Sequence, residues 1–314
     1  MTEDLFLALP GFGFAVIDGL SDRTGHRYGG LSAGQMAARL VAAETAHWLA
    51  TDRHNLPQTL IERLTAEIAA AYIDAGIYEV AMAEPGRRFG ATLALAIDLG
   101  QTWRFLLAGD SGIRLNGSQI LQNGHPVDIV TSALRIETYH AAKGHGANDE
   151  AAAEVARSVT LNGATELHPG MSPWLDVDDL EAILSRARTR AEAQLFGVPA
   201  CDIDVLLTQG IVQGQGHFQN NINSPMSYAV IDGTEVPMIH IHIEDRSADS
   251  LESIELFTDG YLEPPNGISI AAWEASFATI EAKDPAKIDA HPCPKGSSKE
   301  RWFDDRTVVI VDLR

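Results

Sequence analysis

The spacing of hydrophobic and polar positions changes its period several times along the chain. An apolar run at residues 14–17 ends at Asp18, which is typical of a buried strand followed by a turn. Beyond a glycine-rich loop, apolar residues recur every three or four positions and predict two amphipathic helices at residues 32–51 and 57–75. Ser32 is a suitable cap for the first of these helices.

The rest of the chain continues with hairpins and helices. A two-residue break, Gly100-Gln101, separates apolar runs at 92–99 and 102–108 and predicts a hairpin. The pattern predicts further strands at 228–231, 238–243, 254–257 and 308–311, and helices at 126–142, 176–195 and 269–282. Residues 198–225, rich in Gly, Gln and Asn, are expected to form loops around a short strand at 205–207. Strands in hairpins and helices in pairs favour an α+β fold over a doubly wound parallel sheet.

The amino-acid composition is that of a globular protein with an excess of acidic residues. The chain has 314 residues, 45% of them hydrophobic and 21% charged, as expected for a globular protein without long disordered tracts. The formal net charge of −20 argues against nucleic acid as a partner and suits a protein that holds cations, although plain solubility explains it equally well.

The two cysteines and the lack of long apolar runs bear on the cellular compartment that we expect for the protein. Cys201 and Cys293 form no Cys-x-x-Cys pair, so neither a disulfide framework nor a cysteine zinc site is expected. We find no signal peptide and no apolar run long enough for a membrane helix. A cytoplasmic protein that does not bind membranes is the resulting expectation.

Acidic residues recur where apolar runs end. Four runs end in an acid followed by Gly or Ser, at Asp18-Gly19, Asp110-Ser111, Asp232-Gly233 and Asp259-Gly260. Two more acid pairs, Glu3-Asp4 and Asp304-Asp305, adjoin the first and last strands. Each one alone is also a common turn signal. Gathered together, the carboxylates would repel one another unless a divalent cation bound them, and oxygen-only ligands suit Mg²⁺ or Mn²⁺.

The order of these pieces resembles the metal-dependent Ser/Thr protein phosphatases of type 2C. The matching segments are TEDLF at 2–6, FAVIDG at 14–19, GATL at 90–93, AGDS at 108–111, LFTDGY at 256–261 and DDRTVV at 304–309. The resemblance implies two antiparallel sheets packed face to face with helix pairs outside, in α-β-β-α layers. It also implies a single phosphatase domain over residues 1–314, with a possible flap or insertion within 144–225.

The resemblance further assigns roles to individual residues. Asp18 would bridge two metal ions, joined by the Gly19 carbonyl, while Asp259 and Asp304 would hold one ion. Asp4 would lie beside the other ion, with Glu3 acting through water. Asp110 resembles a residue near a weaker third metal site.

A two-metal centre implies a hydrolytic mechanism. A water bridging both ions would become the nucleophile and attack a phosphoryl group in line. The expected substrates are phosphoserine and phosphothreonine in proteins. A phosphatase for small phosphate esters and a non-catalytic, partner-binding regulator with the same fold remain the alternatives.

Departures from the family concern substrate binding. Members usually carry an Arg shortly before the first acid, but only Met1 and Thr2 stand before Glu3 here. Arg23, in the loop after Gly19, is the candidate replacement for binding the phosphate, with a solvated loop residue as the alternative. Asp232 lies in a hexapeptide that nearly repeats that of Asp18, yet the resemblance gives it no ligand role, so we expect a turn there.

Overall fold

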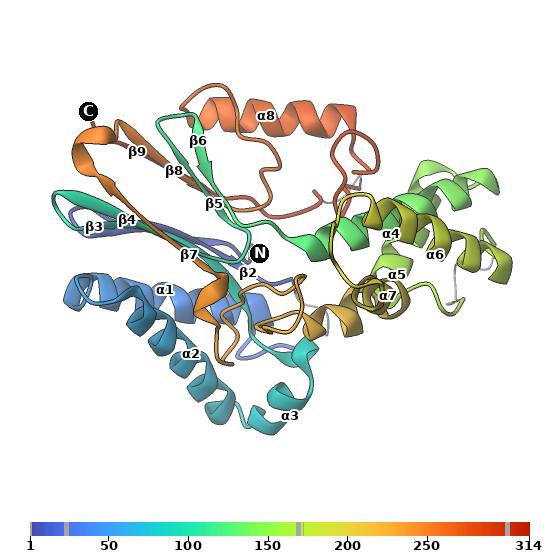
Figure 1. Cartoon of the computed structure of the whole chain (residues 1–314), viewed down its shortest axis with the longest axis horizontal. Coiled ribbons are helices and arrows are strands. Elements are labelled where there is room, and N and C mark those ends of the chain that lie inside the picture. Colours follow the sequence, from blue (N-terminus) through green and yellow to red (C-terminus); the bar gives the residue numbers. More distant parts are fainter. Residues whose placement is uncertain (1, 22–24, 168–170, 172, 299–301) are drawn as a thin grey trace. The chain divides into compact units, whose positions relative to one another are not determined.

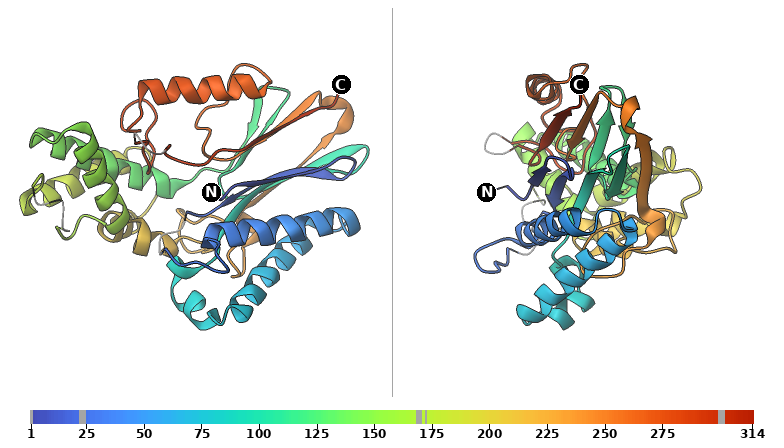
Figure 2. Two further views of the ribbon diagram at one scale, coloured as in Figure 1. Left: turned by 180° about the vertical axis from the view of Figure 1, so that it is seen from behind. Right: turned by 90° about the vertical axis from the view of Figure 1, so that its left-hand side faces the viewer.

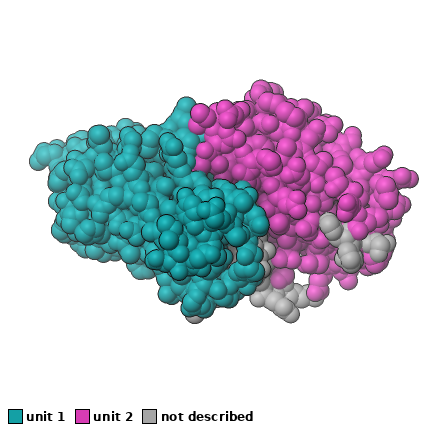
Figure 3. All heavy atoms as spheres, turned by 90° about the horizontal axis from the view of Figure 1, so that it is seen from below, with its two compact units in different colours: residues 1–124, 228–277, 305–314 teal, residues 125–227, 278–304 magenta. Residues whose placement is uncertain are grey.

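The computed structural model describes residues 2–21, 25–167, 171, 173–298 and 302–314. It divides into two compact units, which are coloured separately in Figure 3. Unit 1 consists of residues 1–124, 228–277 and 305–314, and unit 2 of residues 125–227 and 278–304. The segment 144–225, expected to hold a flap or insertion, falls within unit 2.

Unit 1 contains two antiparallel sheets (Figure 1). The first has the order β1-β2-β3-β4-β7, with β1 Leu5–Leu9, β2 Gly13–Gly19, β3 Ala91–Asp98, β4 Thr102–Ala108 and β7 Ile241–Ser247. The second has the order β6-β5-β8-β9, with β5 Gly112–Leu115, β6 Gln119–Leu121, β8 Ser253–Phe257 and β9 Val308–Asp312. The α+β class predicted from the sequence is confirmed.

The two sheets pack face to face. Val16 and Phe105 of the first sheet share one hydrophobic cluster with Ile113 and Leu256 of the second. Along β2 the neighbouring residue Ile17 belongs instead to the cluster on the opposite face, as the two-residue period of a strand requires. The predicted sandwich is therefore present, and its core is filled from both sheets.

Helices cover the outer faces of this sandwich, as Figure 2 shows from two further sides. Helices α1 (Ala33–Thr51) and α2 (Pro57–Asp74) bury Val41 and Leu64 against the first sheet. Ser32 caps α1 in a reciprocal capping box with Gln35. Helix α8 (Ile270–Lys283) contacts the second sheet through Trp273, whose ring centroid lies 4.9 Å from that of Phe257 in β8.

The helices of unit 2 pack around α4. This helix (Pro126–Gly144) contacts α5 (Asp149–Asn162), α6 (Val177–Glu192) and α7 (Ala200–Gln209). Glu137 of α4 forms ion pairs with Arg186 and Arg190 of α6. A short helix, α3 (Tyr78–Ala83), belongs to unit 1. Within the described ranges, none of the helices combines the length and apolar content needed to cross a membrane.

The strand predicted at 205–207 is wrong, because this stretch lies in helix α7. Ile203, Leu206 and Leu207 are its buried residues, and their spacing of three and four positions is that of a helix face. Pro199 starts the helix, and a π-helical turn at Gly210–Gly214 follows it. The glycines and amides that suggested loops thus lie mostly beyond the helix.

Other strand boundaries also differ from the pattern. The predicted strand at 228–231 is not continuous but contains isolated bridge residues, among them Ile231, which pairs with Ala91. Met238–His240 is a 3-10 turn before β7. The sequence analysis missed β1 and the β5–β6 hairpin. Asn116 and Gly117, with φ of 51° and 67°, form the hairpin turn, and this Asn-Gly pair was an available signal.

Two arginine–carboxylate pairs join neighbouring strands, one buried and one exposed. Arg114 of β5 lies opposite Glu255 of β8, with Nε–Oε1 at 2.8 Å and Nη2–Oε2 at 2.5 Å, and both residues are at most 2% exposed. Trp273 Nε1 also donates to Glu255, at 2.6 Å, which ties α8 to the sheet. Arg104 of β4 pairs in the same bidentate manner with Asp245 of β7, whose side chain is 44% exposed.

We predict that Glu255→Ala lowers the free energy of unfolding by about 3–5 kcal/mol, because it leaves the Arg114 guanidinium buried without its counter-charge. Asp245→Ala, which removes an equivalent pair from a wetter site, should cost less than about 1 kcal/mol. Urea unfolding of both variants measures the difference. Equal losses would contradict the importance we give to burial.

Candidate metal centre

Two carboxylates adjoin at one end of the first sheet. The β1–β2 ladder pairs Leu5 with Ile17, so one further step sets Asp4 opposite Asp18. Asp18 shares the strand face of Val16, which points toward the second sheet. Asp4 is only 4% exposed. The strand register thus brings the first two predicted acidic motifs together.

The second sheet reaches this end through Thr258. The Thr258 hydroxyl donates to Asp4 Oδ2 at 2.8 Å and accepts from the Thr307 N–H at 2.9 Å. Asp259 follows Thr258 directly in the chain. A second link runs from the Glu3 N–H to Asp305 Oδ2, at 2.8 Å. Acid-bearing segments beside β1, β2, β8 and β9 therefore meet at one end of the sandwich.

The glycines after the acids are required by close backbone contacts. A Cβ at Gly19 would overlap the carbonyl oxygen of Gly34, and a Cβ at Gly260 would overlap that of Asp305. Any side chain at either position would push these segments apart. The acid-glycine pairs thus allow the tight packing that gathers the carboxylates.

Glu274 of α8 fastens two of the acid-bearing segments. It accepts from Tyr261 Oη at 2.5 Å and from Arg306 Nη2 at 2.8 Å, so one side chain holds the residues that follow Asp259-Gly260 and Asp305. The hydrogen bond from Arg306 is the main cause that holds the pKa of Glu274 below its usual range. The Arg306 guanidinium also lies 3.8 Å from the ring centroid of Phe277. Sequence reasoning missed this role, because no local motif marks Glu274.

Asp110 lies in a loop that is held from both sides. Asn123 donates to the Gly109 carbonyl at 2.9 Å, and Gln122 donates to the Asp110 carbonyl at 2.7 Å. The hydroxyl of Ser111, the next residue, lies 2.9 Å from that of Thr92, which is the β3 partner of Asp18. The loop of Asp110 is thereby linked to the strand beside Asp18.

Two further residues that the sequence predicted for the site, Asp304 and Arg23, are not among the contacts given above. Asp304 is the last residue of unit 2, where its Oδ2 accepts a hydrogen bond from Lys295 Nζ at 2.6 Å. Arg23, the candidate phosphate-binding residue, lies outside the described residues.

Asp232 forms the turn expected from the sequence. Its Oδ1 accepts from the Thr234 N–H at 3.0 Å and its Oδ2 pairs with Arg88 Nη1 at 3.1 Å, in a side chain that is almost fully buried. Gly233, with φ of 82°, packs against Tyr72, whose hydroxyl donates to the Asp232 carbonyl at 2.6 Å. The hexapeptide around Asp232 nearly repeats that of Asp18, yet the contacts of Asp232 stabilise a turn.

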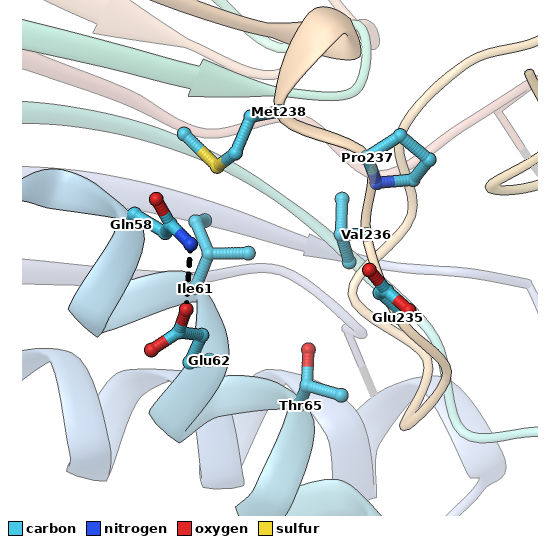
Figure 4. A pocket seen from close by; sticks show the side chains of 8 residues that line it. All are labelled: Gln58, Ile61, Glu62, Thr65, Glu235, Val236, Pro237 and Met238. Atoms are coloured by element: carbon cyan, nitrogen blue, oxygen red, sulfur yellow. Dashed lines mark hydrogen bonds between the residues drawn. The ribbon is translucent and has the colours of Figure 1, made fainter.

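A pocket of about 270 Å³ lies between α2 and the segment before β7 (Figure 4). It is lined by Gln58, Ile61, Glu62, Thr65, Glu235, Val236, Pro237 and Met238. None of these lining residues is cationic and two are acidic, so the pocket does not suit a phosphate group.

Comparisons with known proteins give matches in structure only. No protein-family model matches the chain, and no curated protein matches its sequence. The Mycobacterium tuberculosis serine/threonine phosphatase PstP is similar, with 18% identity, a TM-score of 0.44 and coverage of 100% of this chain and 92% of that chain.

Two further solved structures are similar to about the same degree. The serine/threonine phosphatase Stp1 from Staphylococcus aureus has 12% identity, a TM-score of 0.43 and coverage of 99% and 88% of the two chains. The PstP catalytic domain in complex with two manganese ions has 16% identity, a TM-score of 0.39 and coverage of 99% and 91%. Similarities of this size do not establish a family.

We predict opposite consequences for the two near-identical hexapeptides. Asp232→Ala should lower the unfolding free energy by about 3 kcal/mol or more, because Arg88 loses its buried partner. It should leave the rise in melting temperature caused by Mn²⁺ intact. Asp18→Ala should instead abolish that rise and leave the metal-free protein as stable as wild type or more so, because one repelling carboxylate is gone.

Thermal melts of both variants with and without Mn²⁺ make this comparison. A Mn²⁺ effect lost in Asp232→Ala but kept in Asp18→Ala would show that the metal centre has been placed at the wrong acid.

Proposed function

We propose that the protein is a metal-dependent phosphatase that removes phosphate from phosphoserine and phosphothreonine in proteins. The observation that carries this proposal is the position of Asp4, which the β1–β2 register sets opposite Asp18 and which the hydroxyl of Thr258, the residue before Asp259, contacts across the sheets. Their order in the chain and their neighbouring residues resemble the type 2C phosphatase motifs described above.

The residues present fit divalent cations. The donors are carboxylates, which are ligands that Mg²⁺ and Mn²⁺ favour. The carbonyl of Gly19, the residue after Asp18, is a further oxygen donor, and Gly19 has no side chain that could block it. Asp4 is buried and its Oδ2 is oriented by a hydroxyl donor, as ligating carboxylates commonly are. By the resemblance Asp18 would serve two ions, Asp4 one of them, and Asp259 with Asp304 the other. Asp110 would adjoin a weaker third ion.

The chemistry divides between the cations and the chain. Bound divalent cations would supply an acidified water as the nucleophile and offset the charge of the phosphoryl group. The chain's part is to fix the carboxylates on strand ends and to keep their geometry through Thr258 and Glu274. No side-chain nucleophile is needed, which agrees with a chain whose two cysteines lie outside the acidic motifs.

Further features of the proposal come from the sequence. We propose a single phosphatase domain over residues 1–314, with residues 144–225 selecting the phosphoprotein substrate. We place the protein in the cytoplasm, in a signalling role and without nucleic acid or membrane as a partner. Arg23 stays a candidate for binding the substrate phosphate.

We expect hydrolysis of p-nitrophenyl phosphate and of phosphoserine peptides to require Mn²⁺ or Mg²⁺ and to stop with EDTA. Asp18→Ala and Asp259→Ala should each lower kcat by about 10³-fold or more, which is roughly 4 kcal/mol of transition-state stabilisation. Asp245→Ala, far from the acids on an exposed strand, is the control and should keep wild-type turnover.

The outcomes separate the competing functions. Full activity after exhaustive dialysis against EDTA would exclude the metal mechanism. Turnover of small esters without turnover of phosphopeptides would favour a small-molecule phosphatase. Metal binding without any turnover would favour a non-catalytic regulator.

A further inference from the structure

Strand β1 of unit 1 forms one edge of the first sheet and carries no charged residue. Its sequence is LFLAL, from Leu5 to Leu9, and it pairs with β2 on one side. Among the described residues, no strand pairs with its other side. Leu5, Leu7 and Leu9 pack against the cluster on the α1 side, while Phe6 and Ala8 point to the opposite face and are exposed. An uncharged, apolar edge of this kind is a template to which another strand can add.

Phe6 points into the sandwich but is not covered by it. It lies opposite Val16, whose side chain packs in the core between the two sheets. Cross-strand partners share one face of a sheet, so Phe6 also points toward the second sheet. Strands β8 and β9 contact β2, yet Phe6 is 61% exposed. The core between the sheets is therefore open beside β1.

The opposite edge of the same sheet, strand β7, carries features that hinder pairing. His242 and Glu244 lie opposite Leu107 and Phe105, which belong to the core between the sheets. Arg246 continues the same face of the strand. Charged side chains that point inward at an edge discourage the addition of another strand. Strand β1 has no such side chain, so the two edges of this sheet differ in their capacity to pair.

The backbone groups of Phe6 and Ala8 are directed to the open side of β1. The Leu9 carbonyl accepts from the Phe12 N–H at 2.9 Å in the turn to β2, so it points toward β2. Because the direction of these groups alternates along a strand, those of Leu7 also point toward β2, and those of Phe6 and Ala8 point away from it. A strand added antiparallel to β1 would form its hydrogen bonds with these two residues.

We propose that β1 pairs with β1 of a second copy of this chain, antiparallel and with the two-fold axis at Leu7. This register sets Phe6 of one copy opposite Ala8 of the other, so that their outward N–H and C=O groups bond to each other. A large side chain then lies beside a small one on the inner face. On the other face Leu5 meets Leu9 of the second copy, and the leucines form one apolar row. The strand is thus complementary to itself, which a site for a foreign strand does not require.

Electrostatics favour this arrangement for two chains that each carry a net charge of −20. The paired segment is uncharged, so no like charges face each other across it. Asp4 directly precedes β1. In the antiparallel register the Asp4 residues of the two copies lie about 20 Å apart along the strands, at about 3.4 Å per residue. This separation exceeds the Debye length of about 8 Å at physiological salt, whereas a parallel pairing would set the two residues side by side.

Analytical ultracentrifugation tests the pairing and requires no catalytic activity. One strand pair is a small interface, so we expect a dissociation constant on the order of micromolar. Phe6→Lys sets a charge beside the two-fold axis, and Ala8→Pro removes an outward N–H that the β1–β2 ladder does not use. Each should raise the dissociation constant by about tenfold or more. Ile243→Lys, at an exposed position of β7, is the matched control and should associate as wild type does.

Disulfide cross-linking tests the register. In a background with Cys201→Ser and Cys293→Ser, Leu7→Cys sets two thiols directly opposite each other on the axis, with Cβ atoms about 5 Å apart. Oxidation should therefore yield a covalent dimer. Ala8→Cys sets its thiols on a diagonal at about 7–8 Å, which is too far for a disulfide, so this variant should stay uncross-linked.

A wild-type protein that is monomeric far above micromolar concentration would overturn the inference and leave the edge to a strand from another protein. Association that survives both Phe6→Lys and Ala8→Pro would also overturn it, as would faster cross-linking of Ala8→Cys than of Leu7→Cys. Melting temperatures show whether Phe6→Lys and Ala8→Pro fold. If either does not, the two cysteine variants decide the matter. None of these outcomes bears on the proposed function, since no turnover is measured.

Discussion

The hydrogen bond from the Thr258 hydroxyl to the Asp4 carboxylate joins the two sheets at the end where the acids gather. Because Thr258 also accepts from the Thr307 N–H, the same side chain holds the start of β9 in place. Asp259 is adjacent to Thr258, and Asp18 is opposite Asp4. The geometry of the carboxylates therefore depends on the register of β1 against β2 and on one buried hydroxyl between the sheets.

Carboxylates elsewhere in the chain are stabilised differently. Glu255 and Asp232 each face a buried or nearly buried arginine, and Asp284 faces three backbone N–H groups. These acids need no cation from solution, because the fold supplies the opposite charge. The acids at the end of the sandwich come instead from separate strands of two sheets, and we propose that a divalent cation binds them there.

Local patterns predicted much of the fold and the identity of the acids. The helices at 32–51 and 57–75 and the hairpin at 92–108 have strong periods, and the structure confirms them. The edge strand β1 was missed because its residues are apolar on both faces, and with it the opposition of Asp4 and Asp18, which depends on pairing rather than on sequence. Glu274 and Thr258 could not be assigned roles from the sequence, since their partners are set by packing between distant segments.

The central claim is that divalent cations bind among Asp4, Asp18 and Asp259. Anomalous diffraction at the manganese absorption edge, from crystals grown with Mn²⁺, tests it most directly. The account predicts strong peaks at about 2 Å from carboxylate oxygens of these residues, a distance typical of small divalent cations. A protein that is active with Mn²⁺ but shows no anomalous peak at these three residues would contradict it.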